Sequence, residues 1–253
     1  MNYRIAIASK GRAFSIFQKT IRTLKDLGFP ADIIDIFIVE EERYKYELYG
    51  QADPHYKNLI AGVPGLAEQR KFIVNYYPLN QRILFCDDDI EGFKMLPGLP
   101  PLTEVFDKMF DLTATEGLHL FGIYMVDNLF FMKPRVIKGG VYCVGACFGL
   151  INDRGLNSDN SEREDVWNTC HYLQQDGAVL RLEAVGLKTK YWSGAGGLQE
   201  TRTVESIEAS AHQISNSFPE YLSPPFQKRR GKNIIWNVKF QKHLPRIRLP
   251  LPF

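Results

Sequence analysis

Short apolar runs alternate with amphipathic segments along the first half of the chain. Each run is rich in β-branched or aromatic side chains and is followed by a polar or glycine-containing turn. The segments between the runs show the apolar spacing of helices. The predicted strands are 3–8, 33–39, 58–61 and a fourth that runs from Arg82 to three adjacent acids, and the predicted helices are 14–27, a short one from Glu40, and 66–77.

The second half of the chain is less regular. Its apolar runs are separated by close turn signals, which indicates a mixed or antiparallel extension of a sheet. Ser161 and Glu164 have the spacing of a capping box, so a helix is predicted to open there and to continue to about Gln175. The apolar runs are 118–124, 129–132 and 142–151, and the other predicted elements are a helix at 102–116, a strand at 178–185, a flexible glycine-rich segment at 193–197 and a helix at 204–217.

A strand followed by a helix, repeated along the chain, is typical of a mainly parallel sheet covered by helices. We therefore predict an α/β protein with a single Rossmann-like domain, in which a smaller mixed sheet extends the parallel one. With 253 residues, of which 45% are hydrophobic, the chain is long enough for one large core. The domain is expected to cover residues 1–217, and residues 218–253 are expected to form a basic segment packed on it or appended to it.

Charge is unevenly distributed along the chain. The formal net charge is +2, but no acid follows Glu220, so the tail carries about +8 and the body about −6. This polarity is typical of a protein with a polyanionic partner, although a solvated basic tail would show the same composition. The cations of the tail are Lys228, Arg229, Arg230, Lys232, Lys239, Lys242, Arg246 and Arg248.

Cysteine usage and hydropathy suggest a reducing compartment. The four cysteines have neither the paired spacing of a zinc site nor the density of a disulfide framework. No leader pattern opens the sequence, and no apolar run approaches the length of a membrane span. We therefore expect reduced thiols, no membrane association and a cytoplasmic location.

The fourth predicted strand ends in the carboxylates Asp87, Asp88 and Asp89. Ligands of open α/β sheets bind beyond the carboxyl ends of such strands, and adjacent like charges need solvent or a cation. Mg2+ and Mn2+ prefer oxygen ligands, and Mg2+ combines one or two protein carboxylates with substrate phosphates. Alternate residues of an extended chain share a side, so Asp87 and Asp89 are predicted to face a ligand and Asp88 the sheet margin. A solvated acidic turn is the alternative.

Charged residues on two predicted helices complete the candidate chemistry. Arg70 lies on the helix before the acids, where it suits either a diphosphate or an ion pair on the helix surface. Glu164 and Asp165 lie in the first turn of a later helix. A carboxylate in that place can take a proton from an attacking hydroxyl, but acids there also interact favourably with the helix dipole.

The order of these motifs resembles that of a known family. A strand ending in three acids, with Arg70 before it and Glu164 and Asp165 after it, looks like the DxD and xED motifs of nucleotide-sugar glycosyltransferases of the GT-A fold, over about residues 3–215. Within that fold, three phrases look most like the TET-associated glycosyltransferases, phage and protist relatives of the base J DNA glucosyltransferase. The phrases are Ile7-Ala-Ser-Lys-Gly-Arg12, Gly65-Leu-Ala-Glu-Gln-Arg70, and Gly196-Gly-Leu-Gln199 with Arg202.

The resemblance implies a single GT-A domain and a metal-dependent, inverting sugar transfer with Mn2+ or Mg2+. The implied donor is a UDP-sugar, UDP-glucose or UDP-N-acetylglucosamine, and the implied location is the host cytoplasm if a phage encodes the protein. Asp165 would be the general base, and Glu164 would cap the helix and orient the site. The implied metal ligands are Asp87, Asp89 and His212, and the implied donor-binding residues are Ser9, Lys10, Arg12, Glu40, Arg70, Asp87, Asp88, Gly196 and Gly197.

The acceptor that this branch implies is the hydroxymethyl group of 5-hydroxymethylcytosine or 5-hydroxymethyluracil in DNA. A base inside a duplex must be flipped out or reached through the major groove, and both routes require cations that hold phosphates. The implied nucleic-acid-binding residues are Lys228, Arg229, Arg230 and Lys232, near Trp236, which also suits a core anchor.

Three alternatives remain open. A GT-A enzyme acting on a polysaccharide, lipid or protein would show the same donor site. A nucleotidyltransferase shares the general fold, but the usual glycine-rich pyrophosphate loop is missing after the first strand. A non-catalytic DNA-binding module is disfavoured, because buried acids facing DNA would only weaken its binding.

Overall fold

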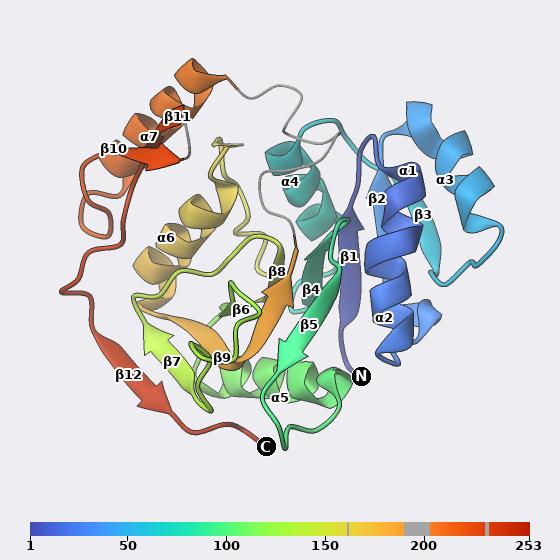
Figure 1. Cartoon of the computed structure of the whole chain (residues 1–253), viewed down its shortest axis with the longest axis horizontal. Coiled ribbons are helices and arrows are strands. Elements are labelled where there is room, and N and C mark those ends of the chain that lie inside the picture. Colours follow the sequence, from blue (N-terminus) through green and yellow to red (C-terminus); the bar gives the residue numbers. More distant parts are fainter. Residues whose placement is uncertain (161, 190–202, 231–232) are drawn as a thin grey trace.

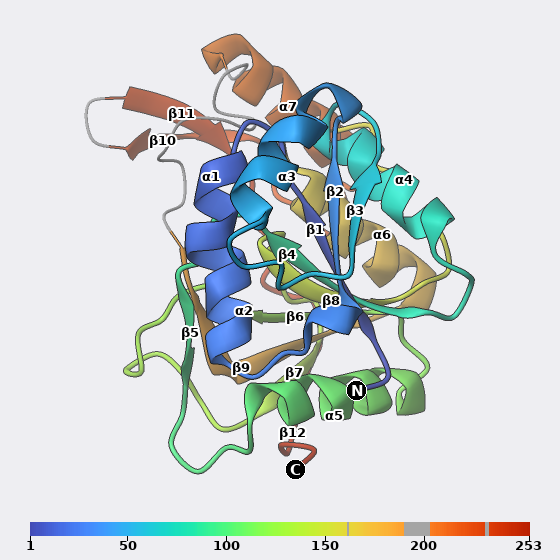
Figure 2. The same ribbon diagram turned by 90° about the vertical axis from the view of Figure 1, so that its right-hand side faces the viewer.

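The computed structural model describes residues 1–160, 162–189, 203–230 and 233–253, with the backbone alone at 230 and 233–235. A single large sheet with helices on both faces forms the centre of the molecule (Figures 1 and 2). Several residues of the sequence predictions lie outside the described part, namely Ser161, Gly196, Gly197, Arg202 and Lys232.

Four strands form the parallel half of the sheet: β1 (Arg4–Ala8), β2 (Ile34–Ile38), β3 (Asn58–Ala61) and β4 (Arg82–Asp87). They lie in the order β4-β1-β2-β3, and each neighbouring pair is parallel. Side chains of β1 alternate between two core clusters, with Ile5 and Ile7 on one face and Ala6 on the other. Because both faces are covered, these strands are continuous apolar runs in the sequence.

The other half of the sheet is mixed and consists of β5 (Gly92–Met95), β6 (Leu120–Tyr124), β7 (Val136–Gly139), β8 (Cys147–Ile151), β9 (Val179–Lys188) and β12 (Arg246–Leu249). β8 joins the halves by pairing antiparallel with both β4 and β6. The order across the whole sheet is β12-β7-β9-β6-β8-β4-β1-β2-β3, with β5 paired to β9. The predicted parallel sheet and its mixed extension are therefore confirmed as one continuous sheet.

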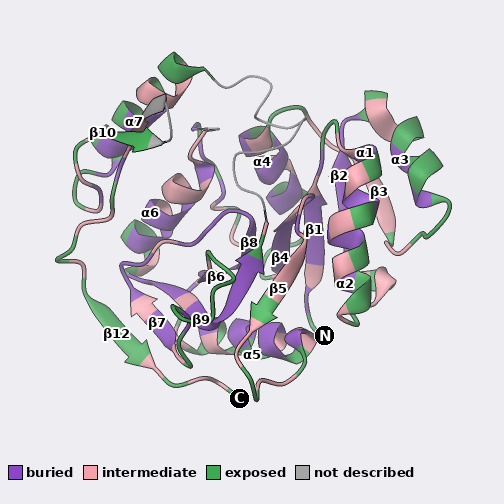
Figure 3. Cartoon of the chain, viewed as in Figure 1, coloured by how far each residue is buried: buried purple, intermediate pink, exposed green. Residues whose placement is uncertain are grey.

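Helices cover both faces of this sheet, and the burial pattern shows a closed core on each side (Figure 3). One face carries α1 (Ala13–Ile16), the π-helical turn η1 (Phe17–Ile21), α2 (Arg22–Asp26) and α5 (Leu102–Thr115). The other face carries α4 (Leu66–Tyr76) and α6 (Glu164–Asp176). Short helices at the margin are η2 (Ala31–Ile33), η3 (Glu40–Glu42) and α3 (Arg43–Gly50). Among the described residues, no helix combines the length and apolarity that a membrane crossing requires.

The basic C-terminal segment contacts the body through its hairpin and through its last strand, among other points. The hairpin of β10 (Phe226–Arg230) and β11 (Asn233–Asn237) packs beside α7 (Val204–Ser217) (Figure 1). A third apolar cluster, which includes Cys170 of α6 and the partly buried Trp236, holds these elements together. Farther along the chain, β12 pairs antiparallel with β7 at the edge of the main sheet. Trp236 therefore fastens the tail, as its aromatic character suggested.

One predicted strand was wrong. The apolar run 129–132 is a turn and not a strand, because Asn128 accepts hydrogen bonds from the backbone N–H groups of Phe130 and Phe131. The next strand after this turn is β7. The predicted capping box involves Ser161, which lies outside the described residues. In the described part, α6 begins at Glu164, and its N-cap, Arg163, makes no capping hydrogen bond with its side chain.

Gly139 provides a test of how β12 is attached. Its φ is +130°, and a Cβ at this position would lie 2.1 Å from the carbonyl oxygen of Pro245, just before β12. We predict that Gly139→Ala lowers the free energy of unfolding by about 2 to 3 kcal/mol, measured by chemical denaturation, because strain adds to the clash. The control, Gly28→Ala, has a φ of +80° but nothing within 4 Å, and is expected to cost about 1 kcal/mol. Equal losses of stability in the two variants would contradict the close contact between Gly139 and the segment before β12.

Candidate active site

Three acids occupy the turn after β4, at the carboxyl edge of the parallel strands. Asp88 is the innermost: Ser9, which follows β1, donates a hydrogen bond of 2.6 Å to its carboxylate. The Ser9 hydroxyl is in turn 2.8 Å from the hydroxyl of Tyr46 on α3. Because β1 and β4 are parallel neighbours, their carboxyl ends bring Ser9 and Asp88 together.

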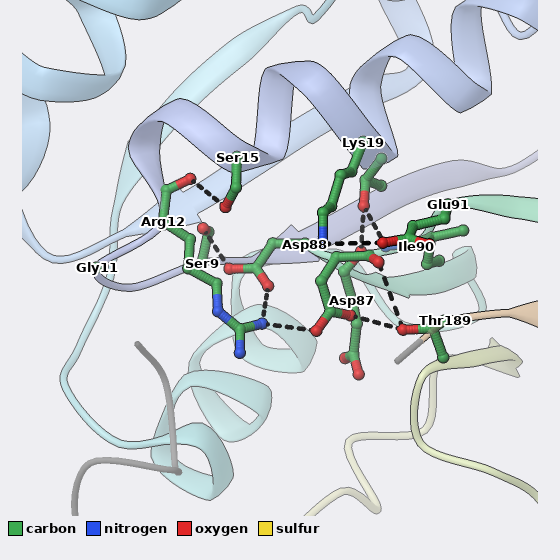
Figure 4. A network of polar contacts seen from close by, with 12 residues as sticks. Ser9, Gly11, Arg12, Ser15, Lys19, Asp87, Asp88, Ile90, Glu91 and Thr189 are labelled. Atoms are coloured by element: carbon green, nitrogen blue, oxygen red, sulfur yellow. Dashed lines mark hydrogen bonds and ion pairs between the residues drawn. The ribbon is translucent and has the colours of Figure 1, made fainter. Parts of the chain in front are cut away.

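Arg12 binds two of these acids at once. Its Nη1 lies 2.7 Å from Asp88 (Figure 4). The same Nη1 lies 2.9 Å from Asp89. Thr189, after β9, donates a hydrogen bond of 3.1 Å to the other oxygen of Asp89. The acid turn is therefore held by side chains from both halves of the sheet.

As predicted, Asp87 and Asp89 are more exposed than Asp88, but strand alternation is not the cause. The side chains of Asp87 and Asp89 are 37% and 19% exposed, against 7% for Asp88. However, β4 ends at Asp87 and the next two residues form a turn, so the extended chain predicted through Asp89 was wrong. Asp88 is directed inward by its hydrogen bonds with Ser9 and Arg12 and not by strand alternation.

Arg70 of α4 is buried beneath the acids. Its side chain is 2% exposed, and Nη2 lies 3.1 Å from Asp87 while Nε lies 3.7 Å from Glu164. The guanidinium carbon also lies 4.9 Å and 5.2 Å from the ring centres of Phe85 and Phe148. The ion pair on the helix surface that we considered for Arg70 is thereby excluded.

Burial perturbs the acids on both sides of Arg70. The pKa of Asp87 is raised by loss of water on the side of its carboxyl group that faces the protein, with the Arg70 charge opposing this rise and the charges of Asp89 and Asp88 adding to it. Burial likewise raises the pKa of Glu164 to about 7, again against Arg70. For Asp88 the pKa is raised by burial despite the nearby Arg12. The site therefore has more negative charge than its two guanidinium groups compensate.

Gly145 allows the start of α6 to lie against the end of β4. Its carbonyl accepts a hydrogen bond of 3.2 Å from Arg70, and its N–H donates one of 3.3 Å to Asp165. A Cβ on Gly145 would lie 3.0 Å from Cβ of Asp165 and 3.1 Å from Oε1 of Glu164, so a larger residue would push the helix away. The hydroxyl of Tyr142 also donates to Asp165. The acids of β4 and of α6 are thus parts of one site.

The carboxylate set fits a hard divalent cation. Asp87 and Asp89 present oxygen ligands at the more exposed part of the turn, and oxygen is the donor that Mg2+ and Mn2+ prefer. Among the described residues, no three His, Cys, Asp or Glu side chains converge on one point. Phosphate and water oxygens would therefore have to complete the coordination, as is usual for Mg2+.

Other predicted residues lie farther from the acids or outside the described part. Glu40 is exposed and pairs with Arg43 at 2.9 Å, and Lys10 is exposed in the loop after β1. His212 is exposed on α7, with its ring 5.1 Å from that of Trp236, and the structure does not bring it to the acids. Lys228 and Arg229 are exposed on β10.

Sequence reasoning missed several residues that hold the site. They share one property: each is a polar residue from a distant segment, with no motif around it. For these residues the sequence gives no local signal, because nothing in it indicates which distant segments meet the acids. The missed residues are Thr20, Glu42, whose carboxylate accepts from the Gly11 N–H at 2.7 Å, Tyr46, Tyr142 and Thr189.

No protein-family model and no curated protein sequence matches the chain. Solved structures do. A mannosyltransferase from Pyrobaculum calidifontis, solved with GDP-Man and Mn2+, matches with a TM-score of 0.51 and 10% identity, over 77% of this chain and 58% of that one. Glucosyl-3-phosphoglycerate synthase from Mycobacterium tuberculosis, solved with phosphoglyceric acid, matches with a TM-score of 0.51 and 10% identity, over 99% and 90%.

These likenesses establish the fold. A mycobacterial protein also matches, with a TM-score of 0.50 and 9% identity over 99% of this chain and 87% of that one. The chain spans only 58% of the length of the mannosyltransferase. The predicted GT-A fold is confirmed, whereas substrates and residue roles do not follow from identities this low.

The perturbed pKa of Glu164 generates a testable pH dependence. Between its usual pKa of 4.5 and its folded value of about 7, the folded state keeps a proton that the unfolded state has lost. The contribution of Glu164 to the free energy of unfolding therefore falls as pH rises through this window, by on the order of 3 kcal/mol, and is constant above it.

Denaturant unfolding of metal-free protein from pH 4 to 8 measures this effect. We predict that Glu164→Gln removes the fall in the free energy of unfolding between these pH values. The control, Glu68→Gln, changes a carboxylate on α4 that is 59% exposed and paired with Lys71, and it should leave this fall unchanged. Parallel curves for the wild type and Glu164→Gln would contradict the raised pKa.

Proposed function

We propose that the protein is a metal-dependent glycosyltransferase that moves a sugar from a UDP-sugar to a hydroxyl acceptor. The observation that supports this most strongly is that Arg70 contacts two acidic groups at once: the turn after β4 through Nη2, and the start of α6 through Nε. One group suits a metal-bound diphosphate and the other suits an acceptor hydroxyl. Sugar transfer requires both at a short separation.

The residues of the acid turn would serve the donor. Asp87 and Asp89 would hold Mn2+ or Mg2+, which supplies Lewis-acid stabilisation of the leaving diphosphate when bound. Ser9, Lys10 and Arg12, at the carboxyl end of β1, would contact the base and ribose, and Arg12 adds a cation fixed on Asp88 and Asp89. Arg70 is buried, so it would act on the donor mainly by fixing the carboxylate of Asp87.

Asp165 would take the proton of the attacking hydroxyl. Its Oδ1 accepts a hydrogen bond of 2.8 Å from the N–H of Val166, and its Oδ2 accepts from Gly145 and Tyr142, so the carboxylate is fixed. A fixed carboxylate opposite the leaving group is what an inverting transfer requires of its base. Glu164, buried between Arg70 and Asn168, would orient this helix start without contacting the acceptor.

We further propose DNA that carries hydroxymethylated pyrimidines as the acceptor. The support is the resemblance to the TET-associated branch, together with the exposed cations of β10. The hairpin that bears these cations connects to the proposed base: Arg163, the residue before Glu164, donates a hydrogen bond of 2.6 Å to the carbonyl of Trp236. Phosphates bound on the hairpin would thus lie on an element anchored to the start of α6.

Mass spectrometry of nucleosides tests the reaction. The protein is incubated with Mn2+, a panel of UDP-sugars and DNA that contains either 5-hydroxymethylcytosine or 5-hydroxymethyluracil, and we predict a mass gain of one sugar. Asp165→Asn should bind UDP normally but lose transfer by about 100-fold or more, because base catalysis is lost. Asp159→Asn, at a 74% exposed acid, is the control. Sugar transfer to a polysaccharide, lipid or protein, with none to DNA, would refute the DNA acceptor.

Salt dependence tests the hairpin separately. We predict that replacing Lys228 and Arg229 by Ala makes the slope of log affinity for DNA against log salt less negative by up to about 2, because two phosphate contacts are lost. Replacing Arg22 and Lys25 on α2 by Ala removes the same charge on another side of the molecule and should leave the slope unchanged (Figure 1). Equal slopes in both variants would show that the hairpin does not bind DNA phosphates and has a structural role.

A further inference from the structure

Thr20 is completely buried, yet its hydroxyl binds a segment far from it in sequence. Oγ1 donates a hydrogen bond of 2.8 Å to the carbonyl of Asp87 and accepts one of 2.9 Å from the N–H of Ile90. We infer that Thr20 is a positioning residue: its hydroxyl fixes the backbone of the acid turn and thereby the direction of the Asp87 and Asp89 carboxylates. This inference rests on the proposed function, in which those carboxylates hold the metal and the diphosphate.

The geometry of the turn explains how a single hydroxyl can hold its backbone. Asp87 and Ile90 are the first and fourth residues of a four-residue turn, and an ordinary β-turn is closed between the carbonyl of the first and the N–H of the fourth. Both of these groups are bound to the same oxygen of Thr20. A hydroxyl suits this task because it can donate and accept at once. Removing the hydroxyl would take this hydrogen-bond partner from the carbonyl of Asp87 and from the N–H of Ile90.

The helix that carries Thr20 holds the acid turn at several points. Thr23 donates to the carbonyl of Ile90 at 3.3 Å. Figure 4 shows that Lys19 pairs with Glu91, at 3.1 Å. At the start of the same helix, Arg12 binds the carboxylates of Asp88 and Asp89. Thus Arg12 binds side chains of the turn, whereas Thr20 binds its backbone.

A π-helical turn places Thr20 in this position. Thr20 lies within η1, where the helix is wider than an α-helix, and such turns occur frequently at functional sites. The neighbours Phe17 and Ile21 still pack in the main core. The chain thereby keeps its apolar side on the sheet while it directs a polar side chain to the acid turn.

A helical threonine ordinarily bonds its own helix. Thr113 of α5 shows this: it is also completely buried, and its hydroxyl donates to the carbonyl of Met109 at 2.7 Å. Thr113 therefore offers a matched control: it is a completely buried helical threonine whose hydroxyl binds its own helix and not the acid turn.

The experiment compares Thr20→Val, Thr20→Ser and Thr113→Val in the full chain. Valine keeps the shape of threonine without the hydroxyl, and serine keeps the hydroxyl. The readouts are the thermal midpoint, the affinity for Mn2+ in the presence of UDP, and amide hydrogen exchange at Ile90. We expect Thr20→Val to remain folded, to lose protection at Ile90 and to bind Mn2+ about 10-fold more weakly, as is typical when a residue that orients a metal ligand is removed.

Thr20→Ser and Thr113→Val should keep Ile90 protected and Mn2+ affinity within about 2-fold of the wild type, whatever their thermal midpoints. Two results would overturn the inference: wild-type Mn2+ affinity in folded Thr20→Val, or equal losses in the serine and valine variants. A wild-type protein that binds neither Mn2+ nor UDP would instead refute the proposed function. Protection of Ile90 would then still show whether the hydroxyl closes the turn.

Discussion

The buried guanidinium of Arg70 is the interaction on which the site depends. It is 2% exposed and lies beside the rings of Phe85 and Phe148, where water cannot screen it. A charge removed from water in this way is stable only with close partners, and Asp87 and Glu164 supply them, one at Nη2 and the other at Nε. Because these acids belong to β4 and α6, one cation fixes the relative position of two elements that are far apart in sequence.

The same constraint explains why the site lies at the join of the two half-sheets. β4 is the last strand of the parallel half, and β8, its antiparallel neighbour, begins just after Gly145. The turn before β8 therefore meets the carboxyl end of β4, and the absence of a side chain on Gly145 leaves room for the start of α6. A uniformly parallel sheet would place no such turn beside the acids.

Around this centre, the acid turn is held by contacts that its own sequence does not show. Arg12 and Thr20 come from one helix, Ser9 from the end of β1, and Thr189 from the end of β9. Each contact satisfies a carboxylate or a backbone group that burial would otherwise leave without a partner. A ligand would thus meet carboxylates that are already oriented, which reduces the cost of ordering them on binding.

The sequence by itself determined the order of the main strands and helices, because buried strands and amphipathic helices differ in apolar period. It also indicated the acids after β4, the pair at the start of α6, and Arg70, since charged residues next to apolar runs stand out locally. Only the tertiary structure decided that Arg70 is buried, that Asp88 faces inward, and that the hydroxyl of Thr20 closes the acid turn. These facts depend on contacts between segments separated by at least 17 residues, which no local pattern encodes.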